Sequence, residues 1–322
     1  MTDPWWKSGV IYQIYPRSFA DANGDGIGDL NGIRDRLDYL AGLGVAALWL
    51  SPIYPSPDVD FGYDVSDYCA IDPKFGTLDD FDHLVSEAHA RGLRIILDLV
   101  LNHTSDQHPW FVESRSSRDN PRRDWYLWRD PAPGGGPPNN WQSVFGGPGW
   151  EMDAATGQYY FHMFCKEQPD VNWRNPQVRQ AMLDVFRFWL ERGVDGFRLD
   201  VFNVYFKSAT FADNPAGLPL PGLAFFTQKH RYDVDQPEMM PLLKEIRDLL
   251  DAYSTPERER YAVGETFGYG ACSAADYMGP DKLHAAFNFA FLGLPWNADA
   301  YLRAMVDWEH ALGHDNWPDY VF

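Results

Sequence analysis

The sequence predicts an α/β fold built on a parallel barrel of strands, the (β/α)8 or TIM-type barrel. Short apolar runs of strand length alternate with amphipathic stretches of helical length, a pattern typical of parallel sheets. The apolar runs are nearly continuous, as expected of strands that are buried on both faces. Reactive side chains follow several different runs, which favours a barrel over an open sheet with one switch point.

Six apolar runs are the candidate strands, and the last of them is the weakest. They are residues 9–15, 46–50, 94–101, 196–201, 261–264 and 283–289. The candidate helices between them have apolar residues at helical spacing. They are residues 30–43, 78–91, 177–192 and 240–252.

One long stretch, residues 104–172, shows no clean helical period and is rich in Pro, Gly, Trp and Asn. A connection of this length without structure of its own would be unusual. We therefore expect a small inserted B domain after the third strand. The predicted organisation is a first part of the barrel at 1–103, the inserted domain at 104–172 and the rest of the barrel at 173–322.

Composition and charge exclude several classes of partner. The chain is 45% hydrophobic and 16% aromatic, which indicates a globular protein with a sizeable core, and its 13 Trp suit either a sugar binder or an aromatic core. The net charge of −19 repels phosphate backbones, so no nucleic-acid partner is expected. Three widely spaced Cys argue against a disulfide framework or a zinc site. No leader pattern or membrane-length apolar run is seen, so we expect no membrane partner and a cytoplasmic location.

The loop at residues 21–29 carries oxygen ligands at alternating positions, like the front of an EF-hand loop. Gly26 supplies its turn, but Gly32 stands where an EF-hand has Glu, so it is not a true EF-hand. Hard oxygen ligands favour a structural Ca²⁺ or Mg²⁺ ion. The alternative is a loop of Asx turns without a metal. The candidate ligands are Asp21, Asn23, Asp25, Ile27 (through its carbonyl) and Asp29.

Carboxylates follow three of the predicted strands, at Asp98, Asp200 and Glu265. Glycoside hydrolysis needs two carboxyl groups beside the scissile bond, one ionised and one protonated. Arg198 lies on the same side of its strand as Asp200, and a neighbouring cation favours an ionised carboxylate. Asp200 is therefore the better nucleophile and Glu265 the better acid. The alternative is that each carboxylate forms a structural salt bridge. His103 also ends a strand, where it could contact a sugar hydroxyl or serve only the structure.

These residues match a known family. Three motifs resemble the first three conserved regions of the α-amylase family (glycoside hydrolase family 13): Asp98-Leu-Val-Leu-Asn-His103, Gly196-Phe-Arg-Leu-Asp200 and Gly264-Glu265. The opening Ile11-Tyr-Gln-Ile-Tyr-Pro-Arg-Ser-Phe19 is similar to the first strand of that family. Gln168-Pro-Asp-Val-Asn172 resembles the short motif of its oligo-1,6-glucosidase subgroup.

The resemblance implies a retaining exo-α-glucosidase that acts on short α-glucosides from the non-reducing end. Asp200 would form the covalent glucosyl intermediate, and Glu265 would protonate the leaving oxygen and then activate water. Arg198 would steer Asp200. In similar enzymes a valine directly after the nucleophile, as Val201 is here, accompanies a preference for α-1,6 linkages. The residues implied for the glucose pocket are Asp64, His103 and Phe145 as its lining and Tyr63 as a stacking platform.

The resemblance also implies that the loop at residues 21–29 holds the structural metal and that residues 104–172 wall the pocket. One departure stands out: the family's third essential carboxylate, in an Asn-His-Asp motif after strand seven, is absent. We therefore expect a barrel that is incomplete after about strand seven and lacks the C-terminal β domain. Such a sheet would expose strand edges, so the chain should need the missing part for stability and activity.

Other functions stay open at this point. One alternative is a sucrose or maltose isomerase or a glucosyl transferase, which shares the nucleophile step and differs in the acceptor. Another is a non-catalytic homologue or fragment. The residues do not separate hydrolysis from transfer or α-1,4 from α-1,6 preference.

Overall fold

The computed structural model describes residues 4–217, 224–266, 274–312 and 319–320. Its centre is a seven-stranded sheet in the order β1-β2-β3-β7-β8-β9-β10, and every neighbouring pair in it is parallel. The strands are β1 (Ile11–Ile14), β2 (Ala47–Leu50), β3 (Arg94–Leu99), β7 (Gly196–Leu199), β8 (Tyr261–Gly264), β9 (Ala285–Asn288) and β10 (Asp319–Tyr320).

This sheet confirms the predicted barrel and its incompleteness. Each of the six predicted strands is present, with ends trimmed by a few residues, and β10 adds the seventh. The strands follow one another across the sheet in chain order, as connections through covering helices require. Among the described residues β1 and β10 are the two edge strands, so the sheet does not close on itself.

The four predicted helical stretches are helical in the structure, but residues 30–43 form two helices rather than one. The chain leaves the helical conformation at Arg36, where φ is −105° and ψ is 6°. α5 begins with a reciprocal capping box between Thr77 and Asp80, which satisfies two amides at the start of the helix. The longer helices are α3 (Leu30–Asp35), α4 (Leu37–Gly42), α5 (Leu78–Ala90), α7 (Pro176–Glu191), α8 (Met239–Ala252) and α10 (Ala298–Leu312).

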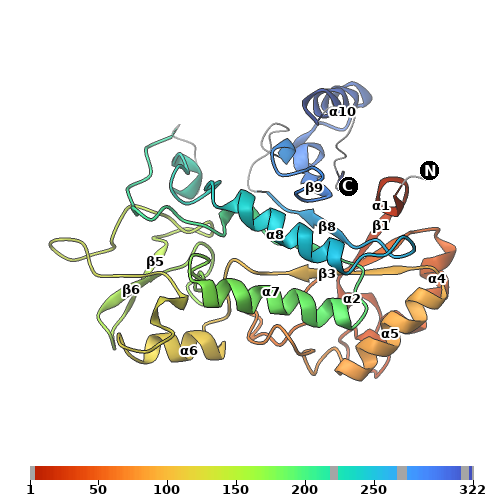
Figure 1. Cartoon of the computed structure of the whole chain (residues 1–322), viewed down its shortest axis with the longest axis horizontal. Coiled ribbons are helices and arrows are strands. Elements are labelled where there is room, and N and C mark those ends of the chain that lie inside the picture. Colours follow the sequence, from red (N-terminus) through yellow and green to blue (C-terminus); the bar gives the residue numbers. More distant parts are fainter. Residues whose placement is uncertain (1–3, 218–223, 267–273, 313–318, 321–322) are drawn as a thin grey trace.

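In Figure 1, α7 and α8 run side by side along the strands, joined by an ion pair of 2.5 Å between Arg179 and Glu245. Two short helices, α1 (Trp5–Ser8) and α2 (Pro16–Phe19), flank β1. No helix in the described ranges is both long enough and apolar enough to span a membrane.

Between β3 and α7 the chain leaves the barrel and forms a small antiparallel sheet of its own, in the order β4-β6-β5. A separate hydrophobic cluster that includes Trp141, Trp150 and Phe161 packs against it. The chain departs and returns at one place, because His103 and Asp170 form an antiparallel bridge. The predicted domain boundaries themselves stay a prediction. The elements of this inserted region are α6 (Pro109–Ser116), η1 (Arg123–Trp125), β4 (Trp128–Arg129), β5 (Trp150–Asp153) and β6 (Gln158–Phe161).

Candidate active site

Three carboxylates surround one guanidinium at the carboxyl ends of β3, β7 and β8. The strand register places Asp98 directly beside Arg198. Arg198 Nη1 donates to Asp98 Oδ1 and to Asp200 Oδ1, each at 2.6 Å, and its Nη2 donates to Glu265 Oε2. Because the ends of parallel strands meet at one edge of the sheet, residues far apart in the chain converge here. The structure therefore brings together the three carboxylates that the sequence singled out.

The pKa of Arg198 shows how strongly this cluster is coupled. Burial alone would lower the pKa of the guanidinium, but the charges of Asp98 and Asp200 raise it above its ordinary value. Burial raises the pKa of Asp98 above its ordinary value, and Arg198 opposes that shift. Arg198 is thus the cation on which the buried negative charge depends.

The carboxylates differ in how much room they leave for a ligand. Asp98 is fully buried and also accepts hydrogen bonds from Trp49 Nε1 and the Tyr63 hydroxyl, each at 3.2 Å. The side chains of Asp200 and Glu265 are 9% and 23% exposed. Asp98 is therefore occupied by protein donors, whereas Asp200 and Glu265 keep surface that a substrate can reach.

Arg198 lies close in the chain to Asp200 but not to Glu265. From the sequence, this neighbour predicts Asp200 as the nucleophile. In the structure Arg198 contacts Glu265 as well as Asp200, so proximity to the arginine does not separate their roles. The two side chains differ in exposure, and the role of each stays a prediction.

The backbone beside each of these two residues has an unusual feature. Val201, directly after Asp200, adopts the left-handed region with φ 36° and ψ 41°, which is rare for a β-branched residue. Its side chain is 6% exposed and packs into the cluster of the inserted region. Before Glu265, a Cβ on Gly264 would come within 2.3 Å of the ring of Phe202, so only glycine fits there.

His103 lies buried at the end of the β3 segment. Its Nδ1 is 3.2 Å from Asn102 Nδ2, and its Nε2 is 3.0 Å from both the Tyr63 carbonyl oxygen and Gln168 Nε2. These contacts hold the ring from both ends. Gln168 belongs to the short motif noted in the sequence, and the structure shows that it reaches the histidine.

Two aromatic rings extend from His103 toward the surface. Phe164 lies 5.2 Å from the His103 ring, and Phe145 lies 5.8 Å from Phe164 on an edge-to-face contact. Phe145 is 53% exposed, so it is the open end of this row. The sequence analysis did not single out Phe164, since an isolated aromatic residue in an aromatic-rich stretch carries no distinctive signal.

Asp64 is fully buried, and its carboxylate is already engaged. It accepts hydrogen bonds from the Ser56 hydroxyl at 2.7 Å and from the amides of Val59 and Asp60 at 3.0 and 3.1 Å. In this conformation Asp64 holds the turn at residues 56–60. Its contact with a sugar stays a prediction.

A buried lysine that the sequence analysis missed connects the barrel with the inserted region. Lys207 Nζ donates to Asn102 Oδ1 at 2.7 Å, to the Asp170 carboxylate and to the Val204 carbonyl. Both side chains of the Lys207–Asp170 pair are fully buried. Burial lowers the pKa of Lys207, and the charge of Asp170 opposes that shift. Since Asn102 also contacts His103, this pair helps to position the histidine.

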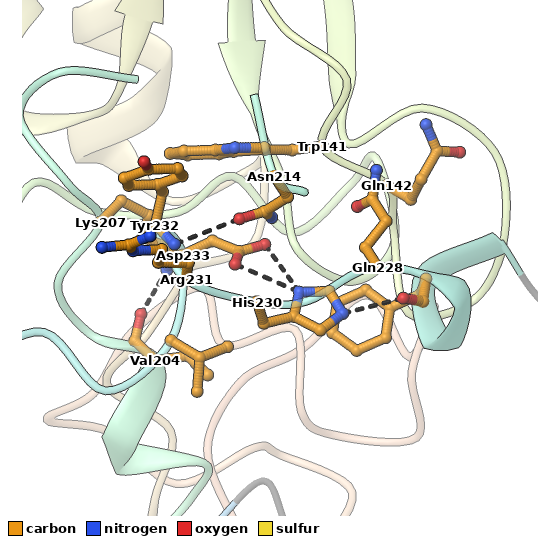
Figure 2. A network of polar contacts seen from close by, with 12 residues as sticks. Trp141, Gln142, Val204, Lys207, Asn214, Gln228, His230, Arg231, Tyr232 and Asp233 are labelled. Carbon is orange, nitrogen blue, oxygen red and sulfur yellow. Dashed lines mark hydrogen bonds and ion pairs between the residues drawn. The ribbon is translucent and has the colours of Figure 1, made fainter. Parts of the chain in front are cut away.

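Lys207 belongs to the connection between β7 and α8, which Figure 2 shows from close by. There the His230 ring lies between the Asp233 carboxylate, 3.0 Å from Nδ1, and the Phe225 carbonyl, 2.8 Å from Nε2. Asn214 Oδ1 accepts from the Tyr232 amide at 3.1 Å. These contacts order the part of this connection that the structure describes.

The side-chain oxygens of the loop at residues 21–29 bond to the loop's own amides. Asp21 accepts from the amides of Gly24 at 2.6 Å and Gly26 at 2.8 Å, and Asp29 caps α3. Asn23 and Asp25 each accept from the amide two residues further on. Within the described ranges no three His, Cys, Asp or Glu side chains gather as a metal site. This geometry matches the Asx-turn alternative, and the metal stays a prediction.

Comparisons with known proteins find chains that are similar in sequence and in structure. The sequence model of the alpha-amylase catalytic domain matches residues 13–313. The chain is 54% identical over 299 residues to a probable alpha-glucosidase of Rhizobium meliloti, covering 89% of this chain and 54% of that protein. It is 45% identical over 335 residues to an oligo-1,6-glucosidase of Heyndrickxia coagulans, covering 97% of this chain and 58% of that protein.

A solved structure of an alpha-glucosyl transfer enzyme, XgtA, superimposes with a TM-score of 0.93 at 47% identity. The match covers 99% of this chain and 60% of that one. The chain thus spans little more than half the length of the curated relatives described above.

Proposed function

The chain belongs to the family of alpha-amylase catalytic domains, and from this premise we propose that it carries the catalytic pair of a retaining exo-α-glucosidase. Its substrates would be short α-glucosides. The observation that carries the proposal is the pair Asp200 and Glu265, which end neighbouring strands, share one buried arginine and keep exposed surface. Two carboxyl groups on either side of a scissile bond are what glycoside hydrolysis requires.

In the first step an oxygen of Asp200 attacks the anomeric carbon of the glucosyl unit. The bond to the leaving oxygen breaks, and the proton of Glu265 passes to that oxygen. The Glu265 carboxylate then takes a proton from water, whose oxygen attacks the anomeric carbon and displaces Asp200. Two inversions leave the α configuration unchanged. Arg198, which contacts both carboxylates, stabilises the negative charge that alternates between them.

The sugar would lie against the residues around His103. We assign Tyr63 as a stacking platform and Phe145 as the open rim, since Phe145 is exposed and joined to His103 through Phe164. Asp64 would have to exchange a contact with the turn at residues 56–60 for one with a sugar hydroxyl. Asp98 would not touch the sugar, because protein donors occupy it.

A second candidate function is glucosyl transfer or isomerisation on the same scaffold. The specific observation in its favour is the 47% identity to the alpha-glucosyl transfer enzyme XgtA. Both functions share the step at Asp200 and differ in the acceptor that meets the intermediate. Incubating the protein with maltose, isomaltose and sucrose side by side separates them: free glucose supports hydrolysis, and a new disaccharide or longer product supports transfer.

Completion of the barrel is a further part of the proposal. We expect full activity only when the sheet is extended beyond β10, because β1 and β10 leave unpaired edges in the described structure. The test compares the rate of hydrolysis of an aryl α-glucoside by the 322-residue chain with the rate for a longer protein in which further strands extend the sheet past β10. Normal hydrolysis of an aryl α-glucoside by the shorter protein would contradict this expectation.

We also propose a structural Ca²⁺ or Mg²⁺ ion at the loop of residues 21–29. Its support is the set of oxygen ligands, of the kind that these cations prefer. Any ligand that binds only the folded state raises the melting temperature. Added Ca²⁺ or Mg²⁺ should therefore raise the melting temperature of metal-stripped protein, and Asp21→Ala should abolish the increase. An unchanged melting temperature with both ions would end the proposal.

A further inference from the structure

A cavity of about 330 Å³ in and around the inserted region is unusually basic for so acidic a protein. Its lining comes from η1, β4, β6 and the segments at residues 172–174 and 209–211. Four arginines line it: Arg118, Arg123, Arg129 and Arg174. Asp98, Asp200, Glu265 and His103 are not part of the lining, so this cavity is separate from the candidate active site.

Two of these arginines have no acidic partner among the described residues. Arg118 pairs with Asp130 at 3.1 Å, and Arg174 pairs with Glu238 at 2.5 Å. Arg123 and Arg129 take part in none of the ion pairs in the described part of the chain. The cavity therefore holds two arginines that form no ion pair within the described ranges.

Arg123 is also left with an unused donor. Its Nη1 and Nη2 donate to the Ser114 carbonyl at 3.0 Å, to Thr156 Oγ1 at 3.1 Å and to Gln158 Oε1 at 2.7 Å. Its Nε is buried and has no hydrogen-bond partner in the structure. A buried donor of a charged group without an acceptor is costly.

Aromatic rings hold the guanidinium groups of Arg123 and Arg129 in place, and Arg129 Nη1 also donates to the Trp128 carbonyl at 2.7 Å. The Cζ atom of Arg123 lies 3.4 Å from the centroid of the Trp128 ring, and that of Arg129 lies 3.7 Å from the centroid of Phe211. Stacking of this kind orients the planar fork before a ligand arrives. It does not replace a counter-charge. Burial lowers the pKa of Arg123 to about 10 and lowers that of Arg129, as expected where the charge is poorly compensated.

We propose that this cavity binds a phosphate-type oxyanion, held by the guanidinium groups of Arg123 and Arg129. Guanidinium forks match the oxygen spacing of phosphate, and a multiply charged tetrahedral anion benefits from several cations around it. Asp124 is the one carboxylate among the lining residues, against four arginines. The cavity has room for more than the ion itself, so both free phosphate and the phosphate group of a sugar ester fit this chemistry.

The test is calorimetric titration of the full chain at low ionic strength with inorganic phosphate and with glucose 6-phosphate, with glucose as the blank. Arg129→Gln should weaken binding of the better ligand by about 10-fold or more, since it removes a charge-assisted hydrogen bond from the guanidinium fork. Arg129→Lys keeps the charge but not the planar fork, so it should weaken binding by less than Arg129→Gln does. Arg36→Gln, a change at an exposed arginine outside the cavity, should leave binding within about 2-fold.

The guanidinium of Arg129 donates to the Trp128 carbonyl at 2.7 Å and forms no ion pair within the described ranges, so both Arg129→Gln and Arg123→Gln are checked for folding by circular dichroism. Tighter binding of glucose 6-phosphate than of phosphate identifies a sugar ester as the ligand, and equal binding identifies the free anion. Absence of binding by either probe would overturn the proposal. So would binding that Arg129→Gln and a folded Arg123→Gln both leave unchanged.

Discussion

Two groups of acidic residues look alike in the sequence and differ in the structure. At the strand ends, Asp98, Asp200 and Glu265 gather around the buried Arg198. At residues 21–25 the acidic side chains are exposed and accept hydrogen bonds from the amides of their own loop. The first group depends on a counter-charge, and the second on local backbone geometry.

The difference shows where carboxylates can be used for chemistry. A buried carboxylate cannot be stabilised by water, so its pKa depends on each neighbouring charge. Removing one member of such a cluster therefore changes the free energy of unfolding strongly. An exposed carboxylate is solvated and screened, so it adds little energy beyond its local turn. Substitutions in the buried cluster should therefore cost far more than substitutions in the exposed loop.

In the longer protein with the extended sheet, Asp200→Asn should reduce kcat on an aryl α-glucoside by about 10⁴-fold or more, because removing a catalytic nucleophile costs on that order. The amide has nearly the same size, so melting temperature should change little. Asp119→Asn, at an exposed position, is the matched control and should retain full activity. If the Asp200→Asn variant kept a tenth or more of the normal rate, Asp200 would not be the catalytic nucleophile.

Arg198→Met should destabilise the protein by about 3–5 kcal/mol, because it leaves buried carboxylates without their cation. Burial already raises the pKa of Asp98, and without Arg198 nothing equivalent opposes that shift. The folded variant should then bind more protons than the unfolded chain, so its stability should fall as pH rises. Urea unfolding at pH 5 and pH 7 measures both effects.

The control for Arg198 is Arg192→Met, which removes a partly exposed ion pair with Asp82. It should cost about 1 kcal/mol or less, with little dependence on pH. Equal losses in the two variants would show that burial does not govern these arginines.

Lys207→Met extends the contrast to a second buried pair. It should cost about 3 kcal/mol, since Asp170 is left buried without its cation. Adding Asp170→Leu to this variant should recover part of the loss, because the uncompensated charge is then removed as well. A double-mutant cycle from urea unfolding gives the coupling. Strictly additive losses would argue against a coupled pair.

Asp21→Asn should change the stability of metal-free protein least of all, because the side chain is exposed. The amides of Gly26 and Gly24 hold the pKa of Asp21 below its ordinary value. The stabilisation from a lowered pKa is present above the ordinary value and is lost as pH falls through the folded-state value. NMR titration of the Asp21 carboxyl should show the lowered midpoint. A midpoint at or above about 3.9 would contradict the local hydrogen bonds.

Most of the barrel could be predicted because its strands are short and buried on both faces. The run at residues 94–101 reads as a strand, and β3 spans Arg94–Leu99 with five of its six residues buried. The break at Arg36 could not be predicted, since an arginine within an amphipathic stretch gives no stop signal. The convergence of Asp98, Asp200 and Glu265 could be predicted, because parallel strands end at one edge of the sheet.

The kind of fold and the residue types at the strand ends follow from periodic patterns within short segments, so they can be read from the chain alone. Which side chains meet across those segments depends on how the segments pack. It placed Lys207 in a fully buried ion pair, engaged Asp64 in a local turn and set Arg198 against both Asp200 and Glu265. These outcomes depend on burial and on contacts between residues far apart in the chain, and a local sequence pattern predicts neither.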